Sequence, residues 1–183
     1  MGLDAPRVIT PRIDVRVPVL ALGRYAGARR HAIVAAKDRG RTDLNTPLAR
    51  AMALGVHRLL EWGLLDLPLT IVPAPTRRWA ARRRGGDPVT RIATLATAGH
   101  PHITVVRALR MTALARDSAG LGSAARERNV AGRVLLTSRR VPADGDVLLV
   151  DDIVTTGATA RESVRVLQTA GARVSAVLAL AAA

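Results

Sequence analysis

The sequence is poor in several residue types, and each shortage excludes a class of protein. It has no cysteine, which excludes disulfides, cysteine-ligated zinc and cysteine nucleophiles. It has no phenylalanine, one tyrosine and two tryptophans. These rings are too few for a platform that stacks the bases of single-stranded nucleic acid. The only lysine, Lys37, is followed by Asp38 and not by Ser or Thr, which also excludes a Walker A phosphate loop.

Long apolar runs are missing as well. No run reaches the roughly 18 apolar residues of a transmembrane helix, so we expect no membrane span. The first residues carry Asp4 and no apolar stretch, so we expect no signal peptide and a cytoplasmic protein. The chain has 183 residues, 49% of them hydrophobic. This length and composition suit one α/β domain with its own core.

The charge is strongly one-sided, at +14, and almost all of the positive charge is arginine. Guanidinium groups bind phosphate oxygens with two parallel hydrogen bonds. The charge therefore indicates either a polyphosphate substrate or the backbone of a nucleic acid. The alternative is that most of these arginines only keep the surface solvated.

Turn residues and apolar spacing predict the elements of the first two thirds of the chain. Strands are expected at residues 13–17, 69–72, 103–106 and 133–137, with a hairpin of residues 19–25 and 31–37 around Ala26-Gly27. Helices are expected from Thr46-Pro47 to Trp62, from Pro88 behind a capping Asp87 to Ala98, and over residues 123–129. Residues 107–121 have no steady period and are expected to form a long loop.

The last third has the clearest pattern. An apolar strand over Val147–Val150 precedes a loop, a helix from Gly157 to Gly171, and a second apolar strand over Val174–Leu180. Strands without polar alternation are buried on both faces, which is typical of a parallel sheet. The unit is therefore expected to be a strand–helix–strand crossover in an α/β fold.

The chemistry of this unit concentrates where its first strand ends. Asp151 and Asp152 follow the strand, and Thr155, Thr156, Gly157 and Thr159 lead into the helix. A helix N-terminus suits a phosphate, whereas carboxylates accept hydrogen bonds from hydroxyls. A sugar with a phosphate on one side and a diol on the other satisfies both halves. The alternative is that the two acids merely cap the strand.

The stretch from Val147 to Thr159 resembles the signature of type I phosphoribosyltransferases: a hydrophobic strand, two acids, two variable residues, Thr-Thr-Gly and a nearby Thr. The resemblance implies a phosphoribosyltransferase fold that binds phosphoribosyl pyrophosphate. It implies that Asp151 and Asp152 are catalytic and hold the ribose hydroxyls. It also implies that Mg²⁺ bridges those hydroxyls and the pyrophosphate. The residues implied to hold the 5′-phosphate are Thr155, Thr156, Gly157, Ala158 and Thr159.

Further residues resemble the ComF/GntX-like branch of that family, although the chain lacks the four-cysteine zinc module usual there. They are Lys37-Asp38-Arg39-Gly40, residues 71–75, Arg84-Gly85, Arg116-Asp117 and residues 126–132. The resemblance implies a small N-terminal hood, which we place with a lead helix in residues 1–62, and a core in residues 63–183. It implies either transfer to or from a nucleobase or a non-catalytic role beside DNA-uptake machinery. We expect a homodimer.

Two more segments are expected to complete the site. Pro75, Thr76, Arg77 and Arg78 follow a strand and are expected to hold pyrophosphate, through a cis or strained peptide as the resemblance implies. The alternative is an exposed basic loop. Residues 107–122, with Arg110 and Arg116, are expected to form a flap over the substrate. The alternative is a disordered surface loop whose arginines contact only solvent.

Overall fold

A computed structural model describes residues 5–76, 87–112, 130, 132–137, 141 and 144–183. It contains a six-stranded sheet in the order β1-β2-β8-β7-β3-β4. All neighbouring strands are parallel except β1, which pairs antiparallel with β2 at one edge. The strands of this sheet are β1 (Arg7–Ile9), β2 (Val19–Ala21), β3 (Leu69–Pro73), β4 (Ile103–Val105), β7 (Asp146–Val154) and β8 (Val174–Ala182). The expected α/β fold with a mostly parallel sheet is confirmed.

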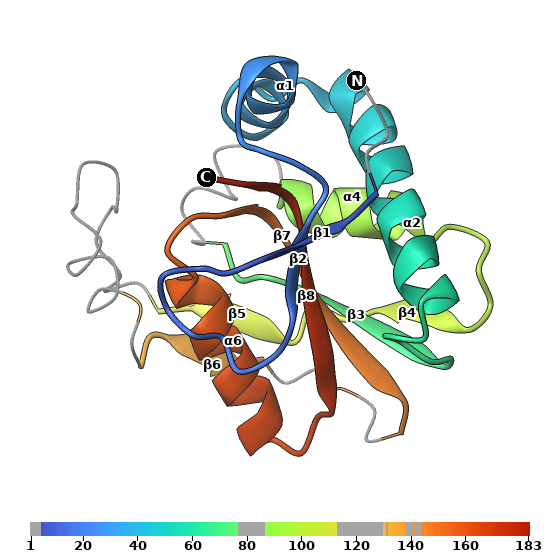
Figure 1. Cartoon of the computed structure of the whole chain (residues 1–183), viewed down its shortest axis with the longest axis vertical. Helices are drawn as coiled ribbons and strands as arrows, with labels where there is room; N and C mark the ends of the chain where they lie inside the picture. The colour runs from blue at the N-terminus through green and yellow to red at the C-terminus, as the bar shows by residue number, and fades with distance from the viewer. Residues whose placement is uncertain (1–4, 77–86, 113–129, 131, 138–140, 142–143) are drawn as a thin grey trace.

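Helices cover both faces of the sheet (Figure 1). One face packs against α1 (Gly27–Asp38), α2 (Asn45–Glu61) and α4 (Pro88–Ala96), with a short 3₁₀ helix η1 (Thr42–Leu44) before α2. The other face packs against α6 (Ala158–Thr169) and a small antiparallel ribbon of β5 (Leu109–Met111) and β6 (Val134–Leu136). Side chains of β7 alternate between these two cores, Leu148 and Val150 on the first and Val147 and Leu149 on the second.

Local sequence rules account for most of these elements. The helix α4 begins where expected, because Asp87 accepts a hydrogen bond from the Thr90 backbone N–H at 3.2 Å and Pro88 occupies the first turn. The expected helix after Thr46 is α2, and the expected strands near residues 69, 103, 134, 147 and 174 are confirmed. The helix expected over residues 123–129 lies outside the described residues.

Three expectations were wrong. Residues 27–38 form the helix α1 and not the second half of a hairpin, because Ile33 and Ala36 are spaced to bury one helical face. Residues 13–17 form no strand, and the N-terminal strand is β1. The loop expected over residues 107–121 contains β5, which is paired with β6. None of the helices in the described part of the chain has the length and apolarity needed to cross a bilayer.

The expected division into residues 1–62 and 63–183 stays a prediction. The helices α1 and α2 lie in the first stretch, but so do β1 and β2. Strand β2 pairs with β8 along Val19–Ala21, so the first stretch also contributes to the central sheet.

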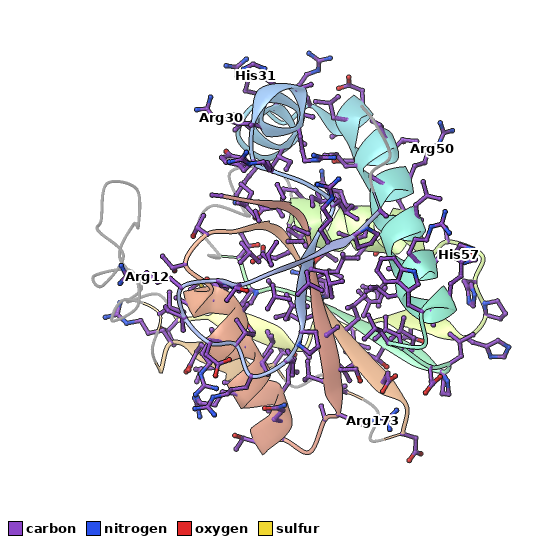
Figure 2. All side chains as sticks on the ribbon, viewed as in Figure 1. Arg12, Arg30, His31, Arg50, His57 and Arg173 are labelled. Carbon is purple, nitrogen blue, oxygen red and sulfur yellow. The ribbon has the colours of Figure 1, made fainter. Side chains whose placement is uncertain are left out.

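The buried carboxylate of Asp146 links the amino ends of β3, β7 and β8 through hydrogen bonds. Asp146 is 3% exposed and accepts hydrogen bonds from Arg173 Nε, Ser175 Oγ and the Asp66 backbone N–H, each at 2.7 Å. Burial alone would raise the pKa of Asp146, but the hydrogen bonds from Ser175, Asp66 and Arg173 outweigh it and lower the pKa. Figure 2 shows Arg173 at the end of the molecule opposite α1.

We expect the Asp146→Asn variant to lose about 1–3 kcal/mol of unfolding free energy at pH 7, because a neutral amide weakens these hydrogen bonds. A lowered pKa means that the stabilisation is present above the unfolded-state pKa of about 3.9 and is lost as pH falls through the folded-state pKa. Urea unfolding of both proteins from pH 7 to pH 3 should therefore show their difference shrinking with acid. Asp66→Asn is the control, since its side chain is exposed. A difference that is constant with pH would contradict this account.

Candidate functional site

The candidate site lies between β3 and β7, from which the chain continues to neighbouring strands on opposite sides of the sheet. Strand β3 leads through α4 to β4 on one side, and β7 leads through α6 to β8 on the other side. The helices α4 and α6 cover opposite faces of the sheet. The connections therefore diverge at the carboxyl ends of β3 and β7, which is where open α/β sheets bind their ligands. The predicted residues Pro75, Thr76, Asp151 and Asp152 all belong to these two ends.

The acid pair lies within β7 and not after it. The strand was expected to end at Val150, but it continues to Val154 because β8 still pairs with it there. The neighbouring β3 stops earlier, with Pro73 opposite Val150. Asp151 and Asp152 thus occupy the part of β7 that has a strand partner on one side only.

The alternation of side chains breaks across the acid pair. Val150 and Ile153 are three residues apart, yet both pack against the core under α1, α2 and α4. The Asp152 N–H donates to Asp151 Oδ1 and the Ile153 N–H donates to Asp152 Oδ1, both at 2.8 Å. Burial raises the pKa of Asp151 well above its usual range, and the Asp152 carboxylate raises it further, while Lys37 opposes the shift. The two carboxylates are therefore close enough to serve one ligand.

Lys37 is the residue of this site that sequence reasoning missed. Its Nζ forms an ion pair with Asp152 Oδ2, and its side chain is 33% exposed. The sequence predicted residues 31–37 to be a strand of a hairpin, and this prediction did not place Lys37 beside the acid pair. In a helix, Lys37 lies one turn after the buried Ile33 and therefore on the same face, toward the sheet.

The segment after β3 lies beside the acid pair. The Ala74 N–H donates to Val150 O at 2.7 Å, immediately before Asp151. Thr76 Oγ1 then donates to Asp87 Oδ1 at 2.7 Å, which ties this segment to the N-terminus of α4. Arg77 and Arg78, also predicted to hold pyrophosphate, lie outside the described residues. Among the described peptide bonds the cis one is Leu67–Pro68, and none of those joining residues 73–76 is cis.

The predicted phosphate loop opens α6 as expected. Gly157 has a φ of +87°, a left-handed conformation that favours glycine, and it is the N-cap residue of the helix. The first N–H to bond within the helix is that of Arg161, to Gly157 O at 2.8 Å. The Ala158 N–H reaches only Thr156 Oγ1, at 3.4 Å. A helix start of this kind presents N–H groups to an anion.

An N-terminal strap, residues 11–15, covers this loop. The Ile13 N–H donates to Thr156 O at 3.0 Å. A Cβ on Gly157 would lie 2.8 Å from Pro11 Cβ and 3.0 Å from Ile13 O. The sequence predicted only a short strand over residues 13–17 in this stretch. The strap instead fixes the loop from outside, and no local pattern indicates such a contact between distant segments.

The flap residues are only partly placed. Arg110 lies in β5 opposite Leu135 of β6 and is partly exposed. Arg116 lies outside the described residues. The role of both arginines as a flap stays a prediction.

The donor set fits Mg²⁺ only in combination with a ligand. Within the described ranges no group of three or more His, Cys, Asp or Glu side chains could hold a metal by itself. Asp151 and Asp152 supply hard oxygen donors beside a helix start suited to phosphate. Mg²⁺ characteristically binds to one or two carboxylates together with phosphate oxygens of the substrate.

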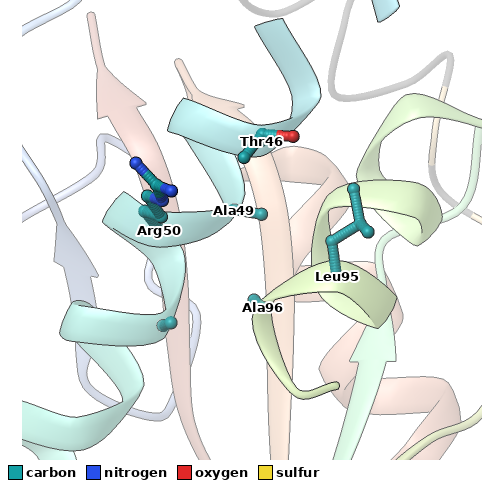
Figure 3. Close-up of a pocket in the computed structure, with 6 residues that line it drawn as sticks. Thr46, Ala49, Arg50, Leu95 and Ala96 are labelled. Carbon is teal, nitrogen blue, oxygen red and sulfur yellow. The ribbon is translucent and has the colours of Figure 1, made fainter. Parts of the chain in front are cut away.

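A separate pocket lies between α2 and α4 (Figure 3). Its lining residues are Thr46, Ala49, Arg50, Ala53, Leu95 and Ala96. Small apolar side chains dominate it, and neither the acid pair nor the loop before α6 contributes to it. This pocket is therefore distinct from the candidate site.

Two glycines that flank α6 allow the strap contact to be tested. Gly157 and Gly171 share a φ of +87°, but a Cβ on Gly171 would meet nothing within 4 Å. We expect Gly171→Ala to cost about 1–2 kcal/mol of unfolding free energy from backbone strain alone. Gly157→Ala should cost about 1–3 kcal/mol more, because the strap must move. Urea unfolding measures both variants, and equal costs would contradict the packing described above.

Comparison with known proteins does not assign the chain to a family. No family model matches the sequence, and no curated protein is significantly similar to it. The features that bear on function are those of the site itself: an acid pair and a helix preceded by a glycine N-cap, at the switch point of a mostly parallel sheet.

Proposed function

We propose that the chain binds phosphoribosyl pyrophosphate together with Mg²⁺ and acts as a phosphoribosyltransferase of the type I fold. One observation carries the proposal. A single strand–loop–helix unit brings two adjacent carboxylates and an anion-binding helix start to the same switch point. A sugar phosphate needs both kinds of partner, because its hydroxyls donate to carboxylates and its phosphate accepts from N–H groups.

The roles follow from the chemistry of each group. Asp151 and Asp152 accept hydrogen bonds from the ribose hydroxyls, and the loop of residues 155–159 binds the 5′-phosphate. The chain leaves β3 beside Val150, where the Ala74 N–H donates to Val150 O, and Pro75, Thr76, Arg77 and Arg78 bind the leaving pyrophosphate. When bound, Mg²⁺ neutralises the charge of that pyrophosphate. Transfer breaks the bond from ribose C1 to the pyrophosphate oxygen and forms a bond from C1 to an acceptor nitrogen. Positive side chains near the departing pyrophosphate lower the barrier.

Calorimetry with phosphoribosyl pyrophosphate and Mg²⁺ tests the binding site. We expect saturable binding to the wild type and at least about tenfold weaker binding to Asp151→Asn and Asp152→Asn, since each exchanges a carboxyl group that can accept at both oxygens for an amide with one acceptor oxygen. Asp66→Asn is the matched control, because it makes the same chemical change at an exposed side chain. Equal binding by all four proteins would refute the site assignment.

The net charge of +14 favours a second candidate, a non-catalytic protein that binds the same ligand and acts beside DNA. A panel of nucleobases separates the two functions. A transferase releases pyrophosphate with one of the bases and only in the presence of Mg²⁺, whereas a sensor binds the ligand and releases none. Retention on DNA that weakens steeply with salt would support the second candidate.

A further inference from the structure

Lys37 connects a lightly packed helix to the candidate site. Of the described side chains of α1, those of Ile33 and Ala36 are buried. The outer side of the helix is basic, and Figure 2 shows Arg30 and His31 pointing away from the sheet. Lys37 points the other way and forms its ion pair with Asp152 Oδ2. The helix α1 is therefore joined to the rest of the protein both by apolar packing and by this ion pair at the candidate site.

The two oxygens of Asp152 have different partners. Oδ1 accepts from the Ile153 N–H at 2.8 Å, while Oδ2 is held by Lys37. The carboxylate is largely buried, at 11% side-chain exposure. A ligand hydroxyl that approaches Asp152 therefore meets the oxygen that Lys37 already binds. An ammonium group is a compact charge on a flexible stem, and it binds phosphate as readily as carboxylate.

We propose that Lys37 is the residue through which α1 responds to the ligand: it neutralises Asp152 in the free protein and moves to a phosphate of the ligand when a sugar hydroxyl occupies Asp152. This inference rests on the proposed function. It adds a ligand-binding residue from α1 to the site. It also explains how the buried Asp152 carboxylate stays compensated when no ligand is bound.

Because Lys37 is the only lysine, its ammonium can be followed without ambiguity. The experiment measures acetylation of the wild type by an N-hydroxysuccinimide ester at fixed pH, with peptide mass mapping. The α-amino group serves as the internal control. With phosphoribosyl pyrophosphate and Mg²⁺ at about ten times Kd, only about a tenth of the protein stays free, so labelling of Lys37 should slow about tenfold. Labelling of the α-amino group should not change.

Variants separate a role in binding from a role in stability. We expect Lys37→Met to weaken ligand binding about tenfold or more in calorimetry, and Lys37→Arg to restore most of it, since a charged donor is lost and then replaced. Arg58→Met removes the same charge from an exposed pair with Glu61 and should leave Kd unchanged. Unchanged or tighter binding by Lys37→Met would overturn the inference, because Lys37 would then be only a competitor for Asp152.

The outcomes distinguish this inference from the proposed function. If the wild type binds the ligand but Lys37 labels at the same rate, the inference alone fails. If calorimetry shows no binding to the wild type, both proposals fail. Protection of Lys37 together with rescue by Lys37→Arg supports both.

Discussion

The site depends on an electrostatic constraint: two adjacent carboxylates lie on a strand that is buried on both faces. Val147 to Val150 have no contact with solvent, and Asp152 is also buried. Charge in such a place requires compensation. The Ile153 N–H and the ammonium of Lys37 supply it for Asp152, and the Asp152 N–H supplies it for Asp151. The raised pKa of Asp151 lowers the charge that remains. The helix α1, which the sequence did not predict, therefore matters to the site because it carries Lys37.

The topology of the sheet places the other components around this pair. Because β3 ends four residues before β7 does, the segment from Ala74 to Thr76 leaves the sheet beside Asp151. Because α6 begins directly beyond β7, its first N–H groups face the same end of the sheet. The strap of residues 11–15 then fixes the loop before α6, while Asp146 fastens the opposite ends of β7 and β8. Each half of the candidate site is thus held by contacts outside it.

The sequence predicted those parts that local patterns specify. The apolar runs at residues 147–150 and 174–180 indicated central parallel strands, and Asp87-Pro88 indicated the start of α4, because burial on both faces and helix capping leave clear signals. The segment of residues 31–37 was misread because Ile33-Val34 favours a strand locally, whereas the spacing of Ile33, Ala36 and Lys37 fits a helix against the sheet. The Lys37–Asp152 pair and the strap contact at Gly157 join distant segments, and no local pattern encodes them.

The central claim is that a sugar phosphate binds across the acid pair and the loop before α6. Amide chemical shifts in a ¹H–¹⁵N NMR titration with phosphoribosyl pyrophosphate and Mg²⁺ test it most directly. We expect the largest changes at the amides of Ala74, Thr76 and residues 151–159, with Asp66 at the opposite end unaffected. Changes that gather instead around Ala49, Ala53 and Leu95, in the pocket between α2 and α4, would contradict it.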